Sequence, residues 1–247
     1  MKQPENLLLL VWLLLTGLVA FGAVVCTDQG LIQAMIVADQ SRICIVLIVM
    51  YLAGLAHTLI RTLYLSRQLD LASQVQSMLG ANPGEPLHIS GRRLTLASGV
   101  TLPSGFLTDY LVDVASAASP PPGTGHEAAP ANDLLDAYAS RIRGAHDFGW
   151  FYIDLMLKVG FLGTLVGFIL MLGSVADTSS LDATTMQKVL TQMSYGMSTA
   201  LYTTLASLVG GILLAVPYQL LERGLNRLLE ITIYVKEVSA ANRPRPS

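Results

Sequence analysis

The chain has 247 residues, of which 52% are hydrophobic and only 13% are charged, and its formal net charge at pH 7 is -2. Soluble domains carry about 25% charged residues, so this composition excludes an ordinary soluble protein and indicates a membrane protein. The slightly negative net charge argues against a nucleic-acid partner.

The N-terminal part of the sequence predicts two membrane spans. Residues 7–26 are almost all apolar, and a run of about twenty such residues is enough to cross a bilayer. This run is too long for the core of an ordinary signal peptide and no small-residue cleavage site follows it, so we interpret it as a retained anchor. Residues 27–42 are expected to be a short connection. The second span is predicted at 43–65, with His57 near its end as an interfacial residue rather than a proton relay.

A soluble insert is predicted between the second and third spans, at residues 66–147. Its charged and polar residues, and its Pro-, Gly- and Ala-rich stretch, set it apart from the apolar runs on either side. We expect in it, in order, a polar helix, an irregular stretch or short hairpin, an amphipathic helix, a loop and a last helix, at 66–79, 87–101, 104–116, 119–132 and 133–146.

Two further spans are predicted after the insert, at about 148–175 and 195–221, joined by a polar loop at 176–192. Residues 222–240 then continue as an amphipathic helix. The predicted fold class is therefore an all-α integral membrane protein with four transmembrane helices, a cytoplasmic insert between helices 2 and 3, and a cytoplasmic C-terminal helical extension. Its predicted divisions are 1–65, 66–147, 148–221 and 222–247.

Charged residues near the spans predict the orientation of the chain. Asp154 and Lys158 are four residues apart on the third span, so they form a pair on one helix face, and Lys158 reaches the inner membrane interface. The positive-inside rule places the insert and both termini in the cytoplasm, because these parts carry most of the basic residues. The insert and tail hold Arg67, Arg92, Arg93, Arg141, Arg143, Arg223, Arg227, Lys236, Arg243 and Arg245, and the opposite side holds only Arg42 and Lys188.

The sequence shows no motif for enzymatic chemistry. It contains no Walker A loop, no zinc cluster and no nucleophile elbow, so we expect no enzyme activity, no metal site and no cofactor. Cys26 and Cys44 are the only cysteines. They are expected at the ends of the first two spans that lie on the same side of the membrane, so the sequence allows one disulfide between them. Free thiols that pack as small apolar groups are the favoured interpretation.

Small and hydroxyl-bearing residues interrupt the apolar runs of the third and fourth spans. Helical spacing places Gly160, Gly163, Thr164 and Gly167 on one face of the third span. The same spacing groups another set on one face of the fourth span: Ala200, Thr204, Ser207 and Gly211. Small residues let helix backbones approach closely and hydroxyls can bond across such contacts, so tight helix packing alone explains these faces.

This helix pair resembles the MotA/TolQ/ExbB family of ion-channel subunits. The sequence GFLGTLVG at 160–167 is similar to the family pattern GLLGTVxG, and Gly196, the stretch 199–204 and Pro217 resemble its pattern of a glycine, EALxxT and a proline. Thr199 stands where many ExbB and TolQ relatives have an acidic residue, and Pro217 lies about one turn further along the helix than in ExbB-like chains. Four spans with a large second loop are more similar to MotA-like subunits than to the three-span ExbB and TolQ.

The resemblance implies the pore-forming subunit of an ion-driven rotary motor in a bacterial inner membrane. It implies five copies of this chain around a dimer of a MotB-, ExbD- or TolR-like single-span protein that carries one membrane Asp. It also implies that Thr164 and Thr204 lie near mid-membrane and face that partner. The residues agree with a partner that supplies the carboxylate. Ions need oxygens or a protonatable group to cross hydrocarbon, and residues 159–175 and 195–221 contain no carboxylate of their own.

The transported ion and the exact role of each residue are left open by the sequence. The predicted ion-pathway residues are Thr164, Thr199, Thr203 and Thr204, although Thr203 alternatively bonds only to its own helix. Protons are favoured over sodium, which needs several oxygen ligands. A non-conducting oligomeric membrane scaffold is the alternative function, and the sequence does not say what a motor would drive. The predicted packing residues are Gly160, Gly163, Gly167, Gly196, Ala200, Ser207, Gly211 and Pro217.

Overall fold

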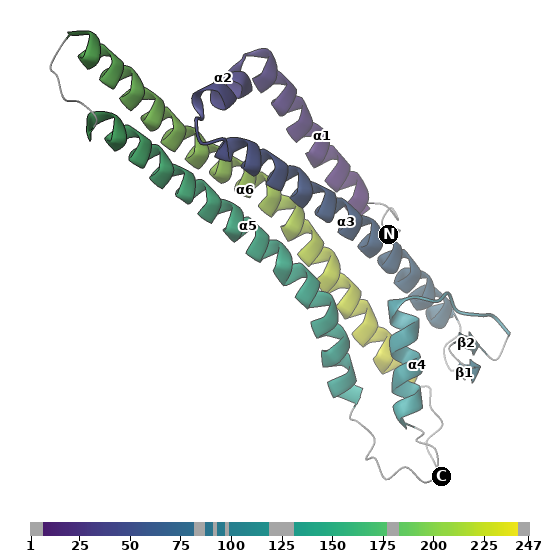
Figure 1. Cartoon of the computed structure of the whole chain (residues 1–247). Coiled ribbons are helices and arrows are strands. Elements are labelled where there is room, and N and C mark those ends of the chain that lie inside the picture. The colour runs from purple at the N-terminus through teal and green to yellow at the C-terminus, as the bar shows by residue number, and fades with distance from the viewer. Residues whose placement is uncertain are drawn as a thin grey trace. The chain divides into compact units, whose positions relative to one another are not determined.

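The computed structural model of the chain describes residues 7–81, 87–90, 93–96, 99–118, 131–176 and 183–241. Figure 1 shows its helices and one pair of strands. The helices are α1 (Leu7–Asp28), α2 (Leu31–Ala38), α3 (Ile43–Ala81), α4 (Phe106–Ala118), α5 (Ala131–Ala176) and α6 (Ala183–Ala241), and the strands are β1 (Leu87–Ser90) and β2 (Arg93–Leu96). Of these, α1, α3, α5 and α6 are long and apolar enough to cross a membrane, which confirms the predicted four-span helical membrane protein.

Several helices extend beyond the predicted boundaries. The predicted connection at 27–42 contains α2, an apolar helix that starts after the left-handed Gly30 (φ 72°). The predicted polar loop at 176–192 was wrong in its second half, because α6 already begins at Ala183. Residues 183–192 hold no Gly or Pro, and their Ala, Met, Gln, Lys and Leu favour a helix. Residues 119–130 of the predicted loop at 119–132 lie outside the described residues. Its last two residues, 131 and 132, already belong to α5.

The chain divides into two compact units that share its three longest helices. The insert unit comprises Met1–Leu9, Arg61–His146 and Leu220–Ser247, and the span unit comprises Leu10–Ile60 and Asp147–Gln219. Each of α3, α5 and α6 contributes one stretch to each unit, because none of them is interrupted at the boundary.

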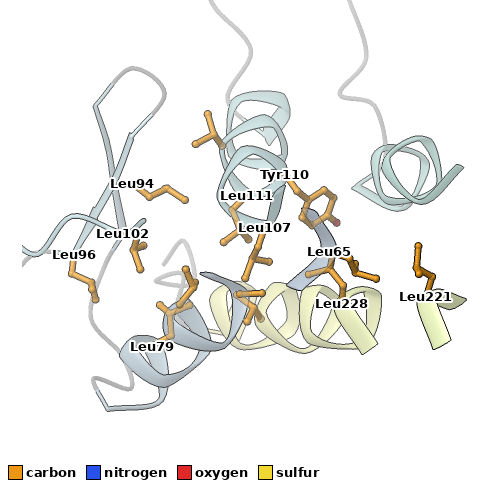
Figure 2. Close-up of a cluster of buried hydrophobic side chains, with 14 residues drawn as sticks. Leu65, Leu79, Leu94, Leu96, Leu102, Leu107, Tyr110, Leu111, Leu221 and Leu228 are labelled. Carbon is orange, nitrogen blue, oxygen red and sulfur yellow. The ribbon is translucent and has the colours of Figure 1, made fainter. Parts of the chain in front are cut away.

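The insert unit is built around a cluster of buried apolar side chains, which we call the leucine core. Figure 2 shows these side chains reaching toward one another from α3, the β2 region, α4 and α6. Strand β2 pairs antiparallel with β1 and buries every second side chain, Leu94 and Leu96, as expected for a strand with one covered face. The core comprises Leu65, Ala72, Val75, Leu79, Leu94, Leu96, Leu102, Leu107, Tyr110, Leu111, Val112, Leu221, Leu228 and Val235.

Aromatic contacts join α5 to α4 within the insert unit. The ring of Tyr138 packs edge-on against Phe106, with ring centroids 5.5 Å apart, and against Tyr110 at 5.6 Å. Its hydroxyl also donates a hydrogen bond to the carboxylate of Asp113. Aromatic packing and this polar contact therefore help to hold α5 against α4.

Hydrogen bonds and a close contact join α3 to the other long helices of the span unit. The indole nitrogen of Trp12 on α1 donates to the hydroxyl of Thr58 on α3 at 3.4 Å. The hydroxyl of Tyr152 on α5 donates to the backbone carbonyl of Met50 on α3 at 2.8 Å. Leu214 of α6 lies against α3 at Gly54, where a Cβ would come within 2.6 Å of the leucine side chain.

Candidate functional site

Within the span unit, α5 and α6 run side by side and touch through small residues (Figure 1). The buried positions on both helices follow alternating steps of four and three residues, which keep one face of each helix on its neighbour. We call the central part of this contact the small-residue seam. It consists of Gly160, Gly163 and Gly167 on α5 and of Gly196, Ala200, Thr203 and Ser207 on α6.

At one end of the small-residue seam the two backbones touch directly. A Cβ placed on Gly167 would lie 2.6 Å from the backbone nitrogen of Ala200 and 2.7 Å from the carbonyl oxygen of Gly196. A Cβ placed on Gly196 would lie 2.7 Å from the backbone nitrogen of Met171. Backbone atoms cannot move aside as a flexible side chain does, so these two positions require glycine.

Further along, hydroxyl-bearing side chains fill the space above the other two glycines. A Cβ on Gly163 would come within 2.6 Å of the Cβ of Thr203, and a Cβ on Gly160 would overlap the side chain of Ser207. The Thr203 hydroxyl is fully buried and donates to the carbonyls of Thr199 at 2.9 Å and Ala200 at 3.1 Å. The seam is therefore filled by side chains whose hydroxyls bond to their own helix.

Thr164 and Thr204 lie outside the small-residue seam. Thr204 is exposed, and its hydroxyl donates to the carbonyl of Ala200 at 2.9 Å. Thr164 is half-buried, and its hydroxyl donates to the carbonyl of Phe161 at 2.6 Å. A hydroxyl that donates one bond keeps acceptor capacity on its oxygen. Both threonines sit among exposed apolar side chains, which include Phe161, Leu165, Phe168, Leu201, Leu205 and Leu208.

The structure corrects the predicted face of the fourth span in one detail. Ala200, Ser207 and Gly211 are buried as a group, but Thr204 is exposed and Thr203 takes its place in the contact. The reason is the step of three residues that follows Ala200 in the alternating pattern. Successive residues on a helix lie about 100° apart around its axis, so the hydroxyl of Thr203 is buried in the contact while that of the next residue, Thr204, is exposed.

The fourth predicted ion-pathway residue, Thr199, contacts the turn between α2 and α3. Its side chain is fully buried. Its hydroxyl donates to the carbonyl of Ala38 at 3.1 Å and accepts a hydrogen bond from the backbone nitrogen of Gln40 at 3.3 Å. In the described chain Thr199 therefore links two segments that are far apart in the sequence.

Asp154 and Lys158 are paired on the outer face of α5. The ammonium nitrogen of Lys158 lies 2.5 Å from a carboxylate oxygen of Asp154, and the two side chains are 69% and 55% exposed, respectively. Pro217 is buried inside α6, which continues to Ala241 although the proline supplies no N–H to the carbonyl four residues earlier. Gly211 faces Leu157, whose side chain would lie 3.2 Å from an added Cβ.

A second group of polar and aromatic residues lies in the span unit, and of its members only His57 was singled out from the sequence. His57 Nδ1 lies 2.8 Å from the hydroxyl oxygen of Tyr218, and the His57 ring packs edge-on against Phe148 with centroids 5.8 Å apart. The buried Tyr218 ring occupies the space that a side chain at Gly149 would fill. The one sequence signal for this contact is the glycine itself, which interrupts an aromatic run.

The described residues contain no group of three or more His, Cys, Asp or Glu side chains placed to hold a metal ion. Cys26 and Cys44 are both free thiols. The polar groups of the span unit thus include packed hydroxyls, one buried carboxylate, the His57–Tyr218 contact and one exposed ion pair.

Comparison with protein families finds one match, to the MotA/TolQ/ExbB proton channel family, over residues 136–232. This range holds most of α5 and α6, the whole small-residue seam, and both Thr164 and Thr204. Comparisons with curated proteins and with solved structures gave no match. The segment that carries the small-residue seam, Thr164 and Thr204 is thus the part of the chain that matches the MotA/TolQ/ExbB proton channel family.

Proposed function

We propose that this chain is the pore-forming subunit of a complex that converts ion flow across a membrane into mechanical work. The observation that carries the proposal is the placement of Thr164 and Thr204 on outward faces of α5 and α6. The hydroxyls of Thr199, Thr203 and Ser207 on α6 are instead buried in contacts within the chain. A hydroxyl on an otherwise apolar outer face gains nothing from lipid tails, whereas an ion path needs such oxygens.

The titrating group of the path comes from a partner in this proposal. Asp154 carries the one carboxylate of α5 between Phe148 and Gly173, and it is already paired with Lys158. A single-span protein with one Asp in its span, of the MotB, ExbD or TolR kind, supplies the carboxylate that the hydroxyls face. Five copies of this chain surround two copies of that partner, in a bacterial inner membrane with both termini and the insert in the cytoplasm.

Protons are the proposed ion, with sodium as the alternative. A sodium ion has to replace its hydration shell by several oxygen ligands at once, and a proton does not. The Thr203 hydroxyl, which would add an oxygen to the cluster, is buried and directed at the carbonyls of its own helix. The exposed hydroxyl of Thr204 and the half-buried hydroxyl of Thr164 therefore support a proton path that ends on the partner carboxylate.

The stoichiometry is the first quantity to measure. The chain is co-expressed with a neighbouring single-span protein, purified in mild detergent and weighed by native mass spectrometry. A mass of five copies with two of the partner is the expected result. A monomer, a dimer or an assembly without the partner would instead support the alternative function, a non-conducting membrane scaffold.

The role of the exposed threonines is tested by ion flux in proteoliposomes that contain the assembled complex. Thr204→Val and Thr164→Val are expected to lower the flux by at least about tenfold, because each removes an oxygen from the path while keeping the side-chain shape. Thr203→Val is the matched control, since its hydroxyl is fully buried in the small-residue seam, and its flux should stay close to that of the unaltered chain. Flux in Thr204→Val equal to that of the control would remove the assigned role.

A further inference from the structure

The turn that leads from α2 into α3 contains an unusual carboxylate. Asp39 is only 4% exposed and is the one charged residue that the described part of the chain buries. Its Oδ1 accepts hydrogen bonds from the backbone nitrogen of Ser41 at 3.0 Å and from the Ser41 hydroxyl at 2.6 Å. Its Oδ2 accepts one from the backbone nitrogen of Cys44 at 2.7 Å. We call residues 39–42 the Asp39 turn.

The hydrogen bonds of Asp39 fix the shape of this turn. Three donors on one buried carboxylate hold Asp39, Ser41 and the first residues of α3 in one arrangement, and they satisfy a backbone N–H that the helix start leaves open. Arg42, in the same turn, adopts a left-handed backbone with φ 58°, which is uncommon for a residue other than glycine. Such a backbone persists only where surrounding contacts hold it, and the Asp39 carboxylate supplies these contacts.

The Asp39 turn is also fastened to α6. The Thr199 hydroxyl is placed between the two peptide units that flank Asp39, since it donates to the Ala38 carbonyl and accepts from the Gln40 nitrogen. Capping α3 would need no such contact. The turn therefore does more than start a helix, because it holds α6 at one particular residue.

From Thr199 the connection continues along α6 to the exposed threonine. The carbonyl of Thr199 accepts the hydroxyl of Thr203, which fills the space over Gly163, and Thr204 follows at the next residue. Because an α-helix is stiff over a few residues, fixing Thr199 along the helix axis also fixes the depth and direction of the Thr204 hydroxyl. The backbone contact between Gly167 and Ala200 transmits the same position to α5.

We propose that Asp39 is a positioning residue for the ion path, which holds the turn against which Thr199 sets the depth of α6 and the direction of the Thr204 hydroxyl. This rests on the proposed function, in which Thr204 lines the path. Asp39 itself does not touch the ion in this arrangement. It acts through a fixed turn and one buried threonine.

The test measures the direction of residue 204 without measuring ion flux. Thr204→Cys is introduced into the full chain with Cys26→Ala, and the fully buried Cys44, whose side chain contacts Asp39, is kept. The thiol at residue 204 is modified in membrane vesicles by 2-aminoethyl methanethiosulfonate. Asp39→Ala is expected to change the modification rate several-fold. Thr199→Val should change it by a similar factor, because it removes both hydrogen bonds to the turn and keeps the side-chain shape.

The two substitutions are then combined as a double-mutant cycle. If Asp39 acts through Thr199, the double variant shifts the rate no further than either single variant. Asp39→Asn keeps one accepting oxygen but replaces the other by an NH2 group that cannot accept, so it should restore the original rate only in part. Thr191→Val is the matched control, since the Thr191 hydroxyl bonds only to its own helix in α6, and it should leave the rate unchanged.

Independent shifts that multiply in the double variant, or an unchanged rate in Thr199→Val, would overturn the proposal. If Asp39→Ala does not assemble, Thr199→Val decides alone, because it leaves the carboxylate and its three donors intact. A failure of the proposed function looks different. The assembled wild-type complex would then carry no ions, while the modification rates at residue 204 would still show whether the turn positions α6.

Discussion

The small-residue seam of the span unit and the leucine core of the insert unit stabilise two stretches of α6 in opposite ways. The seam brings backbones together over glycines and leaves little side chain between them. The leucine core fills the space between α3, α4, β2 and α6 with large apolar groups (Figure 2). Apolar burial drives packing in water, whereas helices in lipid gain mainly from close contact and interhelical bonds.

This difference predicts how each region fails. The small-residue seam has no space for an added carbon atom, because several of its nearest neighbours are backbone. The leucine core depends on volume, so it is sensitive to the loss of atoms. Substitutions that add atoms to the seam or remove them from the core test this contrast directly.

The largest effect is expected from Gly167→Val. Its Cβ alone would lie 2.6 Å from the backbone nitrogen of Ala200, so α5 and α6 have to separate. The chain should lose the folded state or its assembly, measured by size-exclusion chromatography and thermal unfolding in detergent. Gly173→Ala on the same helix is the matched control, because nothing lies within 4 Å of its Cβ. Equal behaviour of the two variants would contradict the close contact.

Leu228→Ala should weaken the leucine core. Leu228 is almost fully buried, and removing such a side chain leaves a cavity that costs about 2–5 kcal/mol of unfolding free energy. The effect should appear as faster hydrogen exchange in β2 and α4, with the seam residues of α5 unchanged. Ile233→Ala, an exposed position on the same helix, should cost much less. The core would be less important than proposed if the two substitutions had equal effects.

Gly163→Ala tests the seam at a position where a side chain, rather than backbone, is the neighbour. The added methyl would meet Thr203, and overpacking of this kind costs about 1–3 kcal/mol. Thr203→Ala makes room, so the double variant should recover part of the stability lost by Gly163→Ala. Thermal unfolding of the two single variants and the double variant measures this coupling. Additive losses would show that Thr203 does not fill this space.

Tyr218→Phe is expected to have the smallest effect. It removes the contact between the tyrosine hydroxyl and His57 Nδ1, which is worth about 1 kcal/mol, but keeps the ring over Gly149. The melting temperature in detergent should fall slightly. Tyr234→Phe, at an exposed position of α6, should leave it unchanged. A fall in melting temperature as large as that of Leu228→Ala would mean that the hydroxyl contributes more stability than a single hydrogen bond does.

Much of the fold could be predicted from the sequence because the apolar runs and their interruptions are long. The spans at 7–26 and 43–65 correspond to α1 and the first part of α3, and the predicted helix at 104–116 corresponds to α4. Residues 27–42 could not be predicted in the same way. The helix α2 is short and apolar, and no cap or breaker other than Gly30 marks it.

The site was predictable in its composition but not in its geometry. Spacing identified the small residues that meet at Gly160, Gly163 and Gly167, because helix packing depends on local periodicity. It did not identify Thr203 as the threonine that enters the contact in place of Thr204, because the two are neighbours in the sequence and lie about 100° apart around the axis of α6. The contact of Thr199 with the Asp39 turn joins residues that are far apart in the chain, and no local pattern reports such a pair.

The repeat along α6 limits how the length of this helix can change. Every seventh residue from Ala200 to Val235 is buried, with the first three in the span unit and the last three in the insert unit: Ala200, Ser207, Leu214, Leu221, Leu228 and Val235. An insertion of one residue between Leu214 and Leu221 would rotate every later buried position by about 100° around the helix relative to the earlier ones. An insertion of a whole turn would nearly preserve the spacing.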